Sequence, residues 1–138
     1  MEQATRIPGP DAARVQPYLD CERLDCYRVA LEFQALATEL SSRRASGTLR
    51  DQLDRASVSI VLNIAEGAGR TTRADKARFF AIARGSATEC AAVLDLLAAR
   101  HLLPHAEQSR GRSLLIRIVQ MLTRLIGRPS AALPKPAA

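Results

Sequence analysis

The sequence of 138 residues has no tryptophan, and aromatic residues make up only 4% of it. Hydrophobic residues nevertheless account for 47% of the chain, which is not the composition of a disordered protein. A core must therefore be built from Leu, Ile, Val and Ala side chains. The length predicts one domain, large enough to enclose such a core.

Cysteine is also scarce, with Cys21, Cys26 and Cys90 as the three examples. Their spacing matches no zinc motif, and an odd number is a poor disulfide framework, so we interpret them as reduced cytosolic thiols. No segment approaches the ~18 uninterrupted apolar residues of a membrane span. The first 20 residues lack the apolar centre of a secretory signal. We therefore expect a cytoplasmic protein without a membrane partner, a metal site or a cofactor.

Proline is absent from residues 18–103 and again from residues 105–128. Because proline breaks helix interiors, its exclusion from such long stretches indicates helices. Apolar residues recur there at the three- and four-residue spacing of an amphipathic helix. The pattern predicts four helices, at about 24–43, 49–66, 73–100 and 106–126.

Short connections between these four segments predict an all-α fold, an antiparallel up-down-up-down four-helix bundle. Thr48 and Thr72, each followed three residues later by an aspartate, are the expected N-caps of the second and third helices. The bundle is expected to occupy residues 22–127. A flexible segment, 1–21, would precede it, and a disordered tail rich in proline and alanine, 128–138, would follow.

The second predicted helix is apolar on two sides. One stripe faces the bundle, and a second stripe consists of Val58, Val61, Leu62 and Ala65. A helix that is apolar all round is buried on both sides, and a bundle of this size covers only one of them. The second stripe therefore predicts self-association, with these four residues in the subunit interface.

A narrow polar seam interrupts the same helix. Ser59, Asn63, Glu66 and Arg70 follow i, i+4, i+7, i+11 spacing and share one face. A carboxylate buried there would need a cation as partner, and removing it would cost a few kcal/mol of stability. The residues expected level with Glu66, and so its candidate partners, are Arg28, Arg70 and Arg73.

The segment Gly67-Ala68-Gly69-Arg70 ends this helix in the prediction, with Gly67 as the C-cap. A phosphate-binding loop would need a strand entering it and a helix N-terminus receiving the phosphate. A catalytic base at Glu66 would need a second acid, a metal set or a nucleophile nearby. We find neither arrangement in the sequence and favour a structural role, with no catalytic residue.

The third helix carries a second polar group, Arg84, Gly85, Ser86 and Glu89. Glycine in the middle of a helix costs roughly 1 kcal/mol relative to alanine. We expect the compensation to be close approach of a neighbouring helix at Gly85. Arg84 and Glu89 would anchor that contact through polar links.

Two stretches, LRDQLDRASVSIVLNIAEGAGR and FFAIARGSATECAAVLDLL, resemble the 23S rRNA intervening-sequence family. The signatures are Asn63-Ile64-Ala65-Glu66-Gly67 and Ala83-Arg84-Gly85-Ser86, and the resemblance extends over about residues 22–126. It implies a four-helix bundle of unknown activity. The family is related to the accessory variability determinant of diversity-generating retroelements, a basic pentamer that works with nucleic acid. The resemblance therefore implies a homo-oligomer, with five subunits as the expected number.

The formal net charge of +6 is compatible with an acidic partner. Arg110, Arg117 and Arg124 recur every seven residues on the fourth helix, and Arg128 extends the series. This row is either a solvated face or a track for a phosphate backbone. The aromatic side chains that stack on single-stranded bases are missing near it, so structured RNA is the nucleic acid that would fit.

The leading hypothesis is a non-enzymatic oligomeric scaffold or adaptor that binds structured RNA or an RNA–protein complex. One alternative is a HEPN-like ribonuclease that uses Arg100 and His105, which have the R-x4-H spacing. Pro104 places that segment in a loop and argues against it. The other alternative is a purely structural oligomer with no nucleic-acid role.

Overall fold

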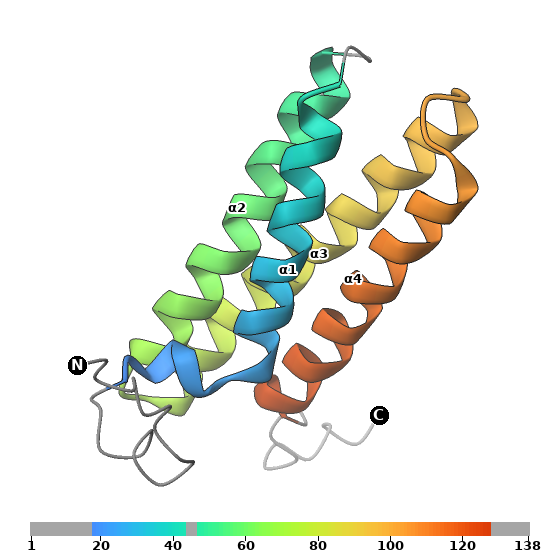
Figure 1. Ribbon diagram of the computed structural model, residues 1–138. Helices are drawn as coiled ribbons and strands as arrows, with labels where there is room; N and C mark the ends of the chain where they lie inside the picture. The colour runs from blue at the N-terminus through green and yellow to red at the C-terminus, as the bar shows by residue number, and fades with distance from the viewer. Residues whose placement is uncertain (1–17, 44–46, 128–138) are drawn as a thin grey trace, which may run out of the picture.

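The computed structural model describes residues 18–43 and 47–127. They form four α-helices preceded by a single 3-10 turn (Figure 1). The elements are η2 (Asp20–Arg23), α1 (Asp25–Ser41), α2 (Gly47–Gly69), α3 (Arg73–Ala99) and α4 (His105–Ile126). Within these described residues there is no strand. The prediction of an all-α domain with four helices is confirmed.

Each helix packs against the one before it in the chain, and α4 packs against α1. The α2–α3 and α3–α4 pairs each run in opposite directions. Across the first, Ser59 contacts Ser86 and Gly67 lies against Phe80; across the second, Asp95 contacts Arg112 and Arg84 contacts Thr123. α2 and α4 consequently run in the same direction, at opposite corners of the bundle (Figure 1).

The core is aliphatic, as the composition required. The largest fully buried side chains come from all four helices and include Phe33, Leu53, Ile60, Ile64, Leu94, Leu115, Ile118 and Leu122. All three cysteines are free and buried. Burial raises the pKa of Cys26 to about 11 and that of Cys90 to about 12, so both thiols are protonated at neutral pH.

Of the three predicted helix caps, one is confirmed and two are not. Thr72 caps α3, and its hydroxyl accepts a hydrogen bond from the Asp75 backbone N–H at 3.2 Å, as predicted. Thr48 is not an N-cap, because α2 already begins at Gly47. Gly67 is not a C-cap, because α2 continues to Gly69. Helix packing here overrides the local preference of glycine to end a helix.

The expected domain boundary at residue 21 falls inside η2. Cys21 in this turn is buried, and η2 packs on α1 and α2, so the folded domain begins before residue 22. The predictions of a flexible segment before residue 18 and of a disordered tail at 128–138 lie outside the described residues. None of the described helices is long and apolar enough to cross a membrane.

Candidate functional site

Ser59 and Asn63 of the predicted seam on α2 form a hydrogen-bonded group with Ser86 of α3. The hydroxyl oxygens of Ser59 and Ser86 lie 2.8 Å apart, within hydrogen-bond distance. The Asn63 amide donates to the Ser59 carbonyl oxygen at 2.9 Å and to the Ser59 hydroxyl at 3.0 Å. The two sequence signatures are therefore linked through Ser59, and the bond between Ser59 and Ser86 joins α2 to α3.

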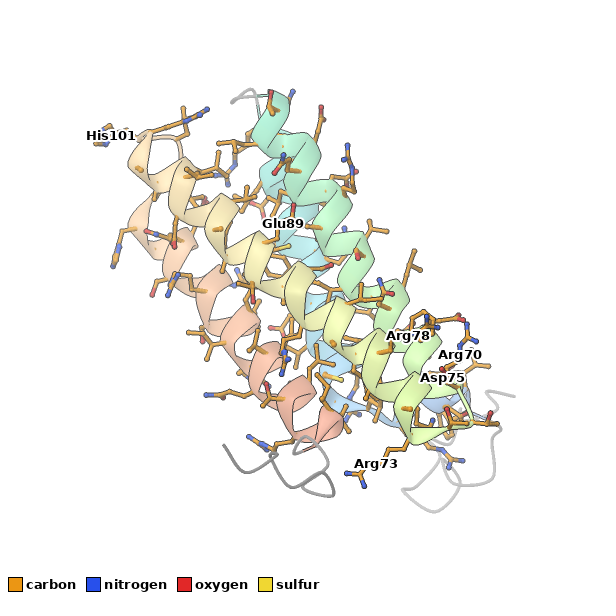
Figure 2. The ribbon with its side chains drawn as sticks, turned by 180° about the vertical axis from the view of Figure 1, so that it is seen from behind. Arg70, Arg73, Asp75, Arg78, Glu89 and His101 are labelled. Atoms are coloured by element: carbon orange, nitrogen blue, oxygen red, sulfur yellow. The ribbon has the colours of Figure 1, made fainter. Side chains whose placement is uncertain are left out.

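Glu66 does not take part in this buried contact. Its side chain is exposed and forms an ion pair with Arg70, one turn later on α2. Arg70 and Arg78 both lie over the Phe79 ring, at 4.6 and 4.8 Å from its centre (Figure 2). The expectation of a buried carboxylate was wrong, because this part of the seam faces outward at the edge of the α2–α3 contact.

Close approach of the two helices occurs at Gly67 and not at Gly85. A Cβ on Gly67 would lie 2.9 Å from the Phe80 ring and 3.1 Å from Phe79 Cβ. A Cβ on Gly85 would meet nothing within 4 Å. The two adjacent phenylalanines of α3 supply the bulk that requires the glycine on α2. This pairing was not predicted, because the spacing within one helix does not show which residue of another helix lies opposite.

The other members of the α3 group point away from α2 or out to solvent. Arg84 donates to the Thr123 hydroxyl of α4 at 3.3 Å, so it links α3 to α4. Glu89 is exposed on the outer surface of α3 (Figure 2). The expected anchoring of one contact by Arg84 and Glu89 together is therefore incorrect.

The second apolar stripe of α2 lies on the outer surface of the bundle. Leu62 is 61% exposed and Val58 is 39% exposed, while Val61 and Ala65 are half-buried. We call these four residues the α2 ridge. Ile82 on α3 is 46% exposed and lies close to the level of Leu62, because Ser59 is opposite Ser86. An exposed apolar side chain therefore lies at the level of the ridge on the neighbouring helix as well.

The three arginines of the predicted basic row, Arg110, Arg117 and Arg124, are exposed on α4, and Arg128 lies outside the described residues. An acidic row with the same seven-residue spacing lies on α1, at Asp25, Glu32 and Glu39. Each acid is level with one arginine, because the end of α1 is fixed to the start of α4. Sequence reasoning missed this correspondence, although the matching spacing was visible.

The ion pair that fixes the end of α1 to the start of α4 is formed by Arg43 and Glu107. The Arg43 guanidinium donates to both carboxylate oxygens of Glu107, at 2.5 and 2.7 Å. Hydrogen bonding by Arg43 holds the pKa of Glu107 below its ordinary value, and Glu107 in turn raises the pKa of Arg43. This pair sets the register of α1 against α4, so the arginine row on α4 and the acidic row on α1 lie at the same levels of two neighbouring helices.

Arg100 and His105 lie on either side of the α3–α4 connection. Arg100 is the C-cap of α3, and His105 is the first residue of α4 after the Pro104 N-cap. His101 between them has a φ of 58°, in the left-handed region. The two side chains are therefore not carried on one helix face. Among the described residues, no group of three His, Cys, Asp or Glu side chains could hold a metal ion.

The described residues form a small all-α protein in which the two sequence signatures, one on α2 and one on α3, come together at the contact between these helices. Residues 22–124 match the model of the family described as 23S rRNA-intervening sequence protein. The chain belongs to this family, and the resemblance inferred from the two motifs is confirmed to that extent. No curated protein matches the chain.

The solved structures with this fold include a protein with unknown function from the S23 ribosomal protein family of Bacteroides thetaiotaomicron VPI-5482. It is 22% identical, with a TM-score of 0.70, and the alignment covers 75% of this chain and 99% of that one. At this identity the likeness concerns the fold alone.

Replacement of Gly67 by alanine tests the close approach. Alanine favours helix by roughly 1 kcal/mol over glycine, but here its Cβ would overlap the buried Phe80 ring, and overpacking typically costs about 1–3 kcal/mol. We expect Gly67→Ala to lower the free energy of unfolding in urea. Gly85→Ala is the matched control and should raise it, because nothing lies within 4 Å. Stabilisation by both changes would contradict the packing role of Gly67.

The contacts of Asn63 and Glu66 predict that these two polar residues contribute differently to stability. Asn63→Ala removes hydrogen bonds that each contribute about 0.5–1.5 kcal/mol. Glu66→Ala removes only an exposed ion pair between residues one turn apart, worth about 0.3–0.5 kcal/mol. Thermal melts should therefore show a clear decrease in Tm for Asn63→Ala and a small one for Glu66→Ala. A larger decrease for Glu66→Ala would restore the buried-carboxylate interpretation.

Proposed function

We propose that this protein is a non-catalytic scaffold that assembles into a closed homo-oligomer, with the antiparallel up-down-up-down bundle as its subunit. The observation that carries the proposal is the exposure of the α2 ridge, above all of Leu62 at 61%. Ile82 enlarges the same apolar surface. The seam residues beneath the ridge are engaged in joining α2 to α3, which supports a structural use of both sequence signatures.

Energetics favour covering this surface. Burial of a large aliphatic side chain contributes roughly 1.5–3 kcal/mol, and contiguous exposed apolar surface commonly marks a protein interface. A two-fold dimer is the commonest closed assembly. The resemblance of the two motifs to those of a pentameric relative leads us to propose five subunits. The ribonuclease alternative is not favoured, because Arg100 and His105 lie on different sides of a helix connection.

A single charge on the ridge tests the assembly. We expect the wild-type chain to be larger than a dimer in multi-angle light scattering, and Leu62→Arg to be a folded monomer, because a buried unpaired cation is costly. The matched control is Leu31→Arg on α1, where the leucine is 45% exposed. This variant should assemble like wild type. A monomeric wild-type chain at micromolar concentration would refute the scaffold.

Structured RNA is the candidate partner of the scaffold, in keeping with the net charge of +6 and with the name of the family. The α4 row would provide the phosphate contacts, and a ring would repeat weak contacts around one axis. The acidic row on α1 would oppose such binding, since carboxylates at the same level repel phosphate. The RNA part of the proposal thus depends on the balance between the two rows.

Two opposite substitutions test this balance. If RNA binds along the α4 row, Arg117→Gln should weaken binding of a structured RNA, and Glu32→Gln, at the same level on α1, should strengthen it. Both changes should act more strongly at 50 mM salt than at 200 mM, because phosphate contacts depend on salt. Fluorescence anisotropy measures both. If neither substitution alters the affinity, the row is a solvated face and the structural oligomer is the remaining function.

A further inference from the structure

A shallow apolar groove runs between α3 and α4, and none of its lining residues belongs to α2. Its volume is about 170 Å³. Ala87 and Ala91 on α3 face Leu115, Ile116 and Val119 on α4 across it. The two alanines leave space where larger side chains would fill the contact, and Ile116 is 47% exposed. The groove can accept aliphatic side chains of the size that the ridge presents.

Polar contacts between α3 and α4 flank this groove: Arg112 is one of its lining residues, and Thr123 follows the lining residue Val119 by one helical turn. At one end, Arg112 of α4 donates to Asp95 of α3 at 3.1 Å. At the other end, Arg84 of α3 donates to Thr123 of α4 at 3.3 Å. The groove is therefore an apolar strip with an arginine at each end. Eleven residues of α4 separate the ends, which is about 17 Å along a helix.

The α2 ridge has the complementary pattern. Val58 and Leu62 form its exposed centre, and the exposed acids Asp54 and Glu66 follow at the same four-residue steps on either side. Twelve residues separate the two acids, or about 18 Å. The ridge is therefore an apolar strip with a carboxylate at each end, and its length matches that of the groove.

We propose that the α3–α4 groove receives the α2 ridge of a second copy of this chain. The inference rests on the proposed self-association and names its second surface. Leu62 and Val58 of one copy would pack between Ala87, Ala91 and Ile116 of the next. Asp54 would lie near Arg112, and Glu66 near Arg84. Charges at the rim of such a contact fix its register more than they add affinity.

The direction of the helices supports this pairing. α2 and α4 run the same way within one subunit, and rotation about an axis along the bundle preserves that direction in the next subunit. An α2 ridge laid beside a neighbour's α4 is then parallel to it, which places Asp54 at the Arg112 end. Because ridge and groove are different surfaces, the contact is head-to-tail, and it forms a ring when the rotation between successive subunits divides a full turn.

Mixing two defective variants tests the contact directly. Leu62→Arg has a damaged ridge and an intact groove, whereas Ile116→Arg has an intact ridge and a damaged groove. Each should be monomeric alone. An equal mixture should form a 1:1 dimer with twice the subunit mass. The intact ridge of the Ile116→Arg variant can still bind the intact groove of the Leu62→Arg variant. Analytical ultracentrifugation at increasing protein concentration measures the mass of each variant and of the mixture. Circular dichroism checks that each variant is folded. Ile116→Ser is the milder replacement if Ile116→Arg does not fold.

The outcomes separate this inference from the proposed function. If a folded Ile116 variant assembles like wild type while Leu62→Arg does not, the groove is not used and only the inference fails. If both variants are monomeric and their mixture stays monomeric at every concentration, the head-to-tail pairing is refuted. If wild type itself is monomeric, the scaffold and the inference both fail. Recovery of the 1:1 dimer supports both.

Discussion

Contact between Phe80 and the backbone at Gly67 sets how closely α2 and α3 approach, and the features of this face depend on that distance. Phe80 is buried, and its ring occupies the space that any side chain at residue 67 would need. With the helices this close, the Ser59 and Ser86 hydroxyls can bond directly across the contact. Hydroxyls separated by one more side-chain layer would each need another partner.

The same close approach turns the remaining side chains of α2 outward. Once Ile60, Ile64 and Gly67 are buried and Ser59 faces α3, Val58 and Leu62 can only lie on the outer surface. A helix has room for one buried stripe and its flanks, so a second apolar stripe remains exposed in the single subunit. The exposure of the ridge is a direct consequence of the packing beneath it.

On the α1–α4 side of the bundle, one ion pair sets the relative positions of the charged residues. Arg43 and Glu107 tie the end of α1 to the first turn of α4. Seven-residue spacing on both helices then brings Asp25, Glu32 and Glu39 level with the α4 arginines. Net charge alone suggested a basic surface for nucleic acid, whereas the register places exposed acids on α1 at the levels of the α4 arginines.

The sequence alone determined the helices, because proline exclusion and apolar spacing are local properties of the chain, and the Thr72 cap needs only a residue three positions away. It also identified the family, through two short signatures. Tertiary structure alone decided which glycine carries a close contact, whether Glu66 is buried, and which residues of α1 lie level with the α4 arginines. Each of these depends on the rotation and level of one helix against another, and a rotation of a fraction of a turn separates a buried position from an exposed one. Composition and spacing within a single helix carry no information about that rotation.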